Sequence, residues 1–381
     1  MISYLDNAAT TFPKPRAVYS EVYRCMTKYC GNAGRGSHSL SLGAARKIFE
    51  CRSAIADLFG VGELERISFT LNTTYALNTV IKGLLRRGDH VIISDIEHNA
   101  VFRPIYKAAS TGEIEYDIFP SMASAPRRSP TLICAKIASL LRPNTRMVIC
   151  SHASNICSMT LPIKEIGEFC HRHGLLFVVD AAQSAGHYPI DVDSMHISAL
   201  CAPSHKGLYG PQGAGIIALG KGVILDTLVE GGNGVNSLDG MMPDFSPERY
   251  ESGTLPTPAI AGLCEGLKYI KSRGLDDISA HEEALFLMAR EKLCNLSGIS
   301  MYATKYVGPT LLFNMRGFSS EELARELDSF GICARGGFHC SALAHKTLGT
   351  PEGGALRISL GAFNGEADIE NLCRALNSIE K

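Results

Sequence analysis

The chain has 381 residues, of which 45% are hydrophobic and 20% are charged, as in an ordinary soluble globular protein. Its 37 Lys and Arg balance 38 Asp and Glu, which excludes the basic charge of a nucleic-acid-binding protein. We find no apolar run long enough for a membrane span and no apolar N-terminal stretch typical of a signal peptide. We therefore expect a cytoplasmic protein, and the length favours two domains.

The first part of the chain alternates short apolar runs with amphipathic stretches. Strands are predicted at residues 67–70, 90–94, 115–119, 146–151, 175–180, 197–202 and 215–219. Helices are predicted between several of them, at residues 75–85, 130–141 and 162–173, with Ser129 and Pro130 as the cap and first position of one. This alternation is typical of an α/β domain whose mostly parallel seven-stranded sheet is covered on both faces.

Residues 231–258 are rich in Gly, Pro, Ser and Asn and predict a long loop. Beyond it we expect helices at residues 259–272, 279–296 and 366–379, and strands at 310–315 and 332–335. Another helix begins at Ser319, with Glu322 placed for a capping box. These elements predict a smaller α+β domain. We divide the chain into an N-terminal arm (1–15), a large domain (16–258) and a small C-terminal domain (259–381).

Thirteen cysteines are present, an odd number, and none forms a Cys-x-x-Cys pair. Most stand in apolar segments, as Cys150 does, and are expected to be small buried residues in a reducing compartment. We expect no metal site. Cys340 differs, because it lies in a polar, glycine-containing run.

Several polar residues directly follow predicted strands: Asp180, Asn72 to Thr74, Glu97 with His98, and residues 152–155. The carboxyl ends of parallel strands meet at one edge of a sheet, where ligands bind. A helix beginning near Thr73 and Thr74 offers free N–H groups and hydroxyls to an anion such as phosphate. The alternative to phosphate binding is that one of these threonines simply caps the helix.

Asp180 closes the apolar run LLFVVD, and Lys206 follows in the loop SHKGLYG. Pyridoxal 5'-phosphate (PLP) needs such a pair, because an amine holds it as a Schiff base and a carboxylate keeps its ring nitrogen protonated. Each residue alone is compatible with a solvated surface. Together they predict a PLP site.

With these motifs the chain resembles the class V aminotransferase family of fold-type I PLP enzymes, and within it the cysteine desulfurases and selenocysteine lyases. The resemblance extends from YLDNAATT at residues 4–11 to LRISL at 356–360. It implies that PLP is bound by Lys206, with its phosphate on Thr73, Thr74 and His205 and on Thr254 of a second copy, so a homodimer is expected. Pro203 stands where relatives carry a serine, which leaves a phosphate role for Ser204 open.

The same resemblance assigns the remaining site residues. His98 would lie on the pyridine ring, and Asn155 and Gln183 would approach the phenolic oxygen. Arg357 would bind the substrate carboxylate, with Arg335 and Asn155 also in contact with the substrate. A buried structural arginine is the alternative for Arg357. His38 would lie near the substrate entrance.

Cys340 lies in the run ARGGFHCSA, which resembles the group II motif of desulfurases. There a cysteine thiolate on a flexible loop attacks the sulfur of the bound substrate, and neighbouring positive charge favours the thiolate. We expect Arg335 and His339 to supply that charge, and Gly336 and Gly337 to let the loop swing. The alternative for Cys340 is another small buried residue.

These features predict a PLP-dependent desulfurase that converts L-cysteine to L-alanine, leaves a persulfide on Cys340 and passes the sulfur to an acceptor protein. A selenocysteine lyase acting on L-selenocysteine, or a C–S β-lyase, would share the fold. A class V aminotransferase would leave Cys340 unexplained. A PLP-binding scaffold without turnover would not need Lys206, Asp180, Arg357 and Cys340 together.

Overall fold

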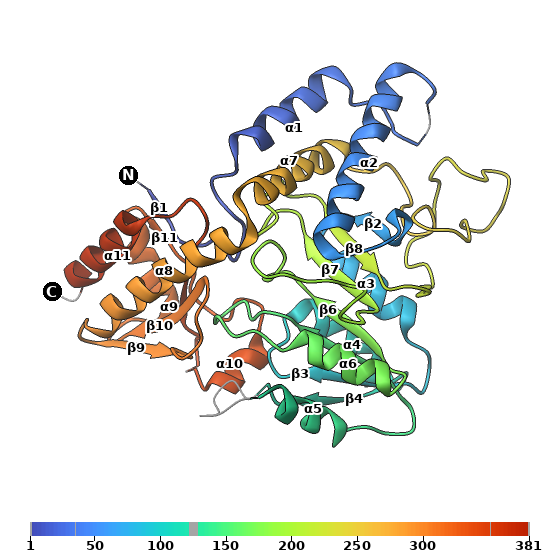
Figure 1. Ribbon diagram of the computed structural model, residues 1–381. Helices are drawn as coiled ribbons and strands as arrows, with labels where there is room; N and C mark the ends of the chain where they lie inside the picture. Colours follow the sequence, from blue (N-terminus) through green and yellow to red (C-terminus); the bar gives the residue numbers. More distant parts are fainter. Residues whose placement is uncertain (1, 35, 122–128, 351, 380–381) are drawn as a thin grey trace.

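A computed structural model describes residues 2–34, 36–121, 129–350 and 352–379. Figure 1 shows two lobes, one built around a large sheet and a smaller one that holds both ends of the chain. The seven strands of the large sheet are β2 (Ile67–Thr70), β3 (His90–Ser94), β4 (Glu115–Phe119), β5 (Thr145–Ser151), β6 (Leu176–Asp180), β7 (Ala199–Pro203) and β8 (Gly215–Leu219).

The strand order is β2-β8-β7-β6-β5-β3-β4. Strand β8 runs antiparallel to β2 and β7, and the other neighbours are parallel. The predicted mostly parallel seven-stranded sheet is thus confirmed. The carboxyl ends of β5 and β6 lie side by side, with Ser151 in register with Asp180.

Helices cover both faces of this sheet because alternate strand residues point to opposite sides. Val91 and Ile93 pack with α3 (Thr73–Leu84) and α4 (Asn99–Ser110), whereas Ile92 packs on the opposite face. The helices that supply most residues of the cluster around Ile92 are α2 (Ser39–Phe59), α5 (Pro130–Ala138), α6 (Ile163–Arg172) and α7 (Thr257–Arg273), and Ile278 and Ala344 of two later helices also belong to it. Helix α1 (Arg16–Lys28) packs on α7, and η1 (Leu64–Arg66) precedes β2.

The smaller lobe combines the last part of the chain with its first strand. Its elements are β1 (Ser3–Tyr4), α8 (Leu275–Cys294), β9 (Ile299–Tyr302), β10 (Thr310–Met315), α9 (Ser320–Ser329), β11 (Ile332–Cys333), α10 (Ala342–Leu348), β12 (Leu356–Ser359) and α11 (Glu366–Ile379). Strand β1 pairs with β11, and β10 lies between β9 and β12. Helix α9 begins with the predicted capping box of Ser319 and Glu322. The three-part domain division stays a prediction.

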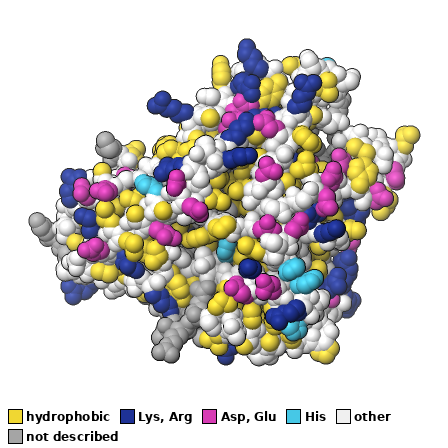
Figure 2. Space-filling model, viewed as in Figure 1, with side chains coloured by type: hydrophobic (Ala, Val, Ile, Leu, Met, Phe, Trp, Pro, Cys, Tyr) yellow, Lys and Arg dark blue, Asp and Glu magenta, His cyan; other side chains and the backbone are white. Residues whose placement is uncertain are grey.

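Between β8 and α7 the chain lacks helices and strands, as predicted, and it loops away from the sheet at the right of Figure 1. Leu238 and Met241 in this segment are exposed. On the face drawn in Figure 2, acidic and basic side chains are intermingled. Of the helices described, none combines the length and apolar character needed to span a bilayer.

Candidate active site

A cavity of about 110 Å³ lies at the carboxyl edge of the large sheet. It brings together residues predicted from five separate segments of the chain. The predicted residues that line it are Thr73, Thr74, His98, Asn155, Asp180, Gln183, His205 and Lys206. Helix starts and strand ends place them there, since each follows β2, β3, β5, β6 or β7.

Asp180 is the last residue of β6, and only 3% of its surface is exposed. Its Oδ1 accepts a hydrogen bond from the Ala182 N–H at 2.9 Å. Burial raises the pKa of Asp180, while the Ala182 N–H and the Lys206 ammonium act in the opposite direction. A buried carboxylate with one hydrogen bond retains accepting capacity for a protonated group in the cavity.

Lys206 follows β7 in a loop that the N-terminal arm holds from outside. The Thr11 hydroxyl donates to the Lys206 carbonyl at 3.1 Å, and the Lys14 ammonium donates to the His205 carbonyl at 2.6 Å. Burial lowers the pKa of Lys206 to about 8; Asp180 partly offsets this, whereas Arg357 and Arg335 add to it. A fraction of this amine is therefore neutral, and thus nucleophilic, near neutral pH.

The cavity wall at the start of α3 suits a phosphate group. The Asn72 side chain caps α3 by accepting from the Tyr75 N–H at 2.9 Å, so neither threonine is the cap. Thr73 Oγ1 and His205 Nδ1 are buried polar atoms without a partner among the described residues. Ser204 points elsewhere, because its hydroxyl donates to the Pro211 carbonyl.

His98 caps α4 and presents a neutral ring to the cavity. Its Nδ1 accepts from the Ala100 N–H at 3.0 Å, which fixes the ring orientation. Burial, followed by the positive charges of Lys206 and Arg335, lowers the pKa of His98 to about 4. An uncharged aromatic ring is suited to packing on a planar cofactor.

The Cys340 loop is tied to the large lobe on both sides of the cysteine. Asn155 donates to the His339 carbonyl at 2.8 Å and accepts from the Ser341 hydroxyl at 2.5 Å. The Asn99 N–H donates to the Cys340 carbonyl at 2.8 Å. Cys340 itself is exposed, so the predicted alternative of a small buried residue does not apply. The Asn155 amide, expected near a cofactor oxygen, thus also positions this loop.

One expectation about this loop changes, and its glycines have a packing role in addition to the predicted one. Burial, with Arg357 next, lowers the pKa of His339 to about 3, so His339 is neutral and does not supply the expected positive charge. Gly336 has a packing role, since a Cβ there would lie 2.3 Å from the Ser320 carbonyl oxygen. Gly337 has a φ of 98° and donates to the Ser320 hydroxyl at 3.0 Å. These glycines anchor the base of the loop.

Arg357 is buried in β12, with 1% of its surface exposed. Its Nη1 donates to the Asn155 carbonyl at 2.9 Å and its Nη2 to Asp6 at 2.5 Å, while Nε lacks a partner among the described residues. Burial lowers its pKa, and Asp6 opposes that effect. The Arg335 backbone pairs with that of Arg357, and the Arg335 side chain is exposed. Arg357, which is predicted to bind the substrate carboxylate, thus already contacts the carboxylate of Asp6.

His38 and Thr254 do not line the cavity of their own chain. His38 is exposed and caps α2 by accepting from the Ser41 N–H at 3.3 Å. Thr254 is also exposed, and its hydroxyl accepts from the Asn32 amide at 3.3 Å. Both therefore belong to a surface formed by the residues before α2 and the irregular segment before α7.

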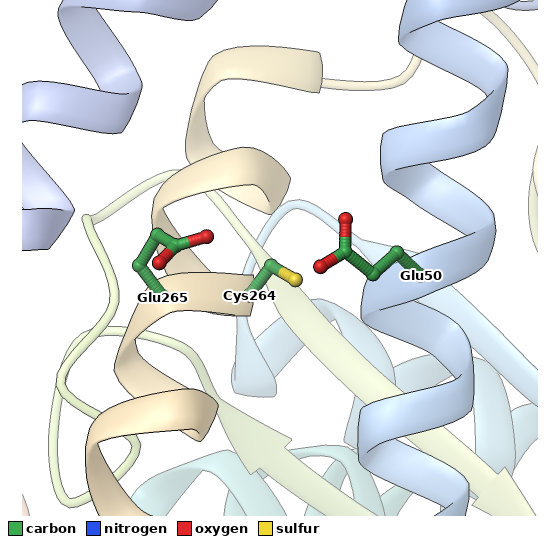
Figure 3. A group of neighbouring side chains, drawn as sticks. All are labelled: Glu50, Cys264 and Glu265. Carbon is green, nitrogen blue, oxygen red and sulfur yellow. The ribbon is translucent and has the colours of Figure 1, made fainter.

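A group of potential metal ligands lies away from the cavity, between α2 and α7. Figure 3 shows Glu50, Cys264 and Glu265, whose ligand atoms lie within 4.8 Å of one another. Lys268 lies 2.6 Å from Glu50 and 2.9 Å from Glu265, and Lys47 lies 2.9 Å from Glu265. Two ammonium groups thus already neutralise these carboxylates, which makes this an ion-pair cluster between two helices.

Comparison with known proteins assigns the fold to a family. The model of the aminotransferase class-V family matches residues 3–372. The chain belongs to this family. It is 33% identical over 384 residues to a protein from Methanothermobacter thermautotrophicus named "Probable cysteine desulfurase", covering 99% of this chain and 94% of that one.

A cysteine desulfurase from Yersinia pestis is 30% identical over 388 residues, covering 99% of this chain and 93% of the relative. The solved apo structure of a cysteine desulfurase from Thermococcus onnurineus NA1 superposes with a TM-score of 0.89 at 29% identity, covering 99% of this chain and 94% of that one. The class V fold thus extends over nearly the whole chain.

Three site residues of this class V protein were not anticipated from its sequence. Thr11 and Lys14 hold the lysine loop, and Ser151 lines the cavity beside Asp180. Ser151 is the last residue of β5, so the rule that ligands bind at strand ends would have found it. Lys14 gave no such signal, because its contact spans 191 residues of sequence.

Proposed function

We propose that this protein is a PLP-dependent cysteine desulfurase, which converts L-cysteine to L-alanine and holds the removed sulfur on Cys340. The observation that carries the proposal is an exposed cysteine on a loop tied to a cavity in which Lys206 and Asp180 meet. The names of the relatives support the same activity. The thirteen free cysteines fit a reducing compartment, so we propose a cytoplasmic location.

The donors lining the cavity fit PLP. A phosphate at the start of α3 would satisfy the unpartnered Thr73 Oγ1 and His205 Nδ1 and would lie at the positive end of the helix. Lys206 would hold the cofactor covalently, Asp180 would face its ring nitrogen, and His98 would pack on its ring. Gln183 also lines the cavity, but its amide donates to the Ala8 carbonyl at 2.9 Å.

When bound, PLP takes up the electrons released at the substrate α-carbon. Lys206, once freed, moves the α-proton; its pKa near 8 leaves an accessible neutral amine for this task. Asp180 holds the proton on the ring nitrogen, because its buried charge is stabilised by a cation there.

Arg335 and Arg357 would bind the substrate carboxylate, with Arg335 the more available of the two because Arg357 already contacts Asp6. The Cys340 thiolate then attacks the substrate sulfur. A sulfur–sulfur bond forms as the carbon–sulfur bond breaks. The electron pair of the broken bond stays on the substrate β-carbon, which takes up a proton to become the methyl group of alanine, and Cys340 is left as a persulfide.

We also propose a homodimer. Thr254 and His38 lie outside the cavity of their own chain, on one exposed surface. In a dimer, this surface would bring the Thr254 hydroxyl to the phosphate end of the other cavity and His38 to its substrate entrance.

The test is product analysis of the PLP-loaded protein with L-cysteine, L-selenocysteine and L-cystine. Alanine from L-cysteine, together with one added sulfur on the peptide containing Cys340, supports the desulfurase. Cys340→Ala should bind L-cysteine, detected as a change in cofactor absorbance, but release little alanine. It should retain more activity with L-selenocysteine, because selenium is the better leaving group. Pyruvate as the main product, or full desulfuration by Cys340→Ala, would favour the β-lyase instead.

A further inference from the structure

Two buried histidines lie behind the Cys340 loop, and the proposed mechanism uses neither of them. His339 directly precedes Cys340, and His345 stands in α10, beyond the cysteine; 4% and 2% of their surfaces are exposed. Their rings are nearly parallel, at 10° with centroids 5.4 Å apart, and His339 Nδ1 lies 3.2 Å from His345 Nε2. A hydrogen bond therefore joins the two side chains.

The partners at both ends of this pair fix the direction of each hydrogen bond. His339 Nε2 lies 2.9 Å from the Arg335 carbonyl, and a carbonyl only accepts, so Nε2 carries the proton. Burial, followed by the charge of Arg357, lowers the pKa of His339 to about 3 and that of His345 to about 4, so both rings are neutral. His339 Nδ1 is then an acceptor, so His345 Nε2–H donates to it, while His345 Nδ1 accepts from the Thr350 hydroxyl at 2.8 Å. The result is one directed chain of hydrogen bonds that ends on the Arg335 carbonyl.

This chain connects the cysteine with both arginines that would bind the substrate carboxylate. The Arg335 carbonyl accepts its last hydrogen bond, and the backbones of Arg335 and Arg357 pair in both directions at 3.1 and 2.8 Å. At the same time His339 is the chain neighbour of Cys340, so a shift of His339 moves the thiol directly. His345 donates the hydrogen bond that holds the Nδ1 side of the His339 ring.

Packing alone does not call for a histidine at position 345. An apolar side chain of similar volume would fill the same space without needing partners, and a buried hydrogen bond adds little net stability. What the histidine adds is a donor aimed at His339 and an acceptor for Thr350, both at fixed positions. Its contribution is therefore orientation.

We propose that His345 is a positioning residue, which orients the His339 ring and thereby holds the Cys340 thiol where it attacks the substrate sulfur. This inference rests on the proposed function, because it concerns the step in which sulfur moves to the cysteine. With its carboxylate bound by the arginines, the substrate presents its sulfur at one place, and a thiol displaced by ~1 Å loses up to roughly 100-fold in rate. His345 touches neither substrate nor cofactor in this role and acts only through His339.

Two reactions of the PLP-loaded protein separate positioning from general damage. Release of alanine from L-cysteine needs the Cys340 thiol, whereas exchange of the α-proton of L-alanine with deuterated water needs Lys206 and the cofactor but not the thiol. His345→Leu keeps a similar volume and removes the donor. We expect its kcat for alanine release, per bound PLP, to fall roughly 10- to 100-fold with little change in KM, while proton exchange stays at the wild-type rate. His345→Gln, whose amide nitrogen replaces Nε2–H as the donor, should restore most of the lost rate.

His90→Leu is the matched control. His90 is likewise buried, and its Nδ1 lies 2.8 Å from the Thr145 hydroxyl, but it begins β3, at the end of the strand away from the cavity. Its replacement should change neither rate per bound PLP. Amide hydrogen exchange of the PLP-free protein provides a readout without activity. The peptide containing residues 338–341 should exchange roughly 10-fold faster in His345→Leu than in wild type, and at the wild-type rate in His345→Gln.

A near wild-type rate of alanine release by His345→Leu would overturn the inference, as would an equal fall of both reactions or an equal loss in His90→Leu. Unchanged amide exchange around Cys340 in His345→Leu would also overturn it, because the loop would then not depend on this residue. If the wild type exchanges the α-proton of L-alanine but forms no persulfide on Cys340, the proposed function fails, and amide exchange alone decides the role of His345.

Discussion

Glu97 is the buried acid whose behaviour tests the electrostatics of this site most directly. It is fully buried beside His98, and its Oε1 accepts from the Ser151 N–H at 2.8 Å and from the Ser94 hydroxyl. Its Oε2 lies 2.9 Å from the Ser151 hydroxyl. Burial raises the pKa of Glu97 to about 8, partly offset by these hydrogen bonds, and nearby Asp180 raises it further. Glu97 is therefore mostly neutral at pH 7.

Glu97→Gln keeps this shape. The glutamine oxygen replaces Oε1 as acceptor, and its amide group faces the Ser151 hydroxyl, which donates to Oε2 in the wild type and is able to accept instead. The pKa of Glu97 is higher in the folded protein than in the unfolded chain. The stability that this carboxyl contributes is therefore fully present below its unfolded pKa and is lost as the pH rises through about 8. The slope is about 1.4 kcal/mol per pH unit, so the wild type should lose roughly 3 to 4 kcal/mol relative to Glu97→Gln between pH ~5 and ~8.

The assay is urea unfolding of both PLP-loaded proteins, followed by circular dichroism across that pH range. Equal m-values would show that the transitions expose the same surface. Glu113→Gln, an exposed residue, provides the same loss of a carboxyl and should show little pH-dependent difference. Infrared difference spectra should contain a protonated carboxyl band that Glu97→Gln lacks. A stability difference that stays flat or shrinks as the pH rises would refute the assignment of a neutral Glu97.

Three further outcomes are expected. Borohydride reduction of the yellow, PLP-loaded protein should bleach it and trap the cofactor on the peptide containing Lys206; a label on another lysine contradicts the site. Asp180→Asn should still bind PLP but lose roughly 100-fold or more in turnover, since an amide does not hold the ring proton; near wild-type rates would exclude this role. Sedimentation should show a dimer, and Thr254→Ala should weaken PLP binding measured by equilibrium dialysis; a fully active monomer argues against subunit sharing.

Central strands such as β3 and β6 were predictable because both of their faces are covered, so they read as short continuous apolar runs. The bounds of β2, β3, β4 and β8 agree with the predicted ranges. The predicted helix at 130–141 ends at Ala138 instead, because Leu140 and Leu141 pack on the core from a turn. An apolar run marks burial but does not by itself distinguish a helix from the loop after it.

The N-terminal helices illustrate what sequence pattern misses. No helix was assigned to α2, whose core-facing side includes Lys47 and Arg52, residues that ordinarily mark a solvated face. Arg52 is buried because Glu251 pairs with it at 2.9 Å from across 199 residues of sequence. The contact between Arg357 and Asp6 is of the same kind. Such pairs depend on chain packing, which local periodicity does not encode.

The loop that carries Cys340 is held by contacts with both lobes of the molecule. His339 and Cys340 adopt left-handed φ angles of 51° and 57°, a conformation that costs non-glycine residues of order 1 kcal/mol each. The large lobe holds them there through Asn155 and the Asn99 N–H, while Gly336 packs on α9 of the small lobe. A flexible, swinging loop was expected from the glycines, but its base is anchored from both lobes. In the described conformation the thiol is thus held at the hollow between α3 and α4 that Cys340 and His98 line, and the expected swing of the loop stays a prediction.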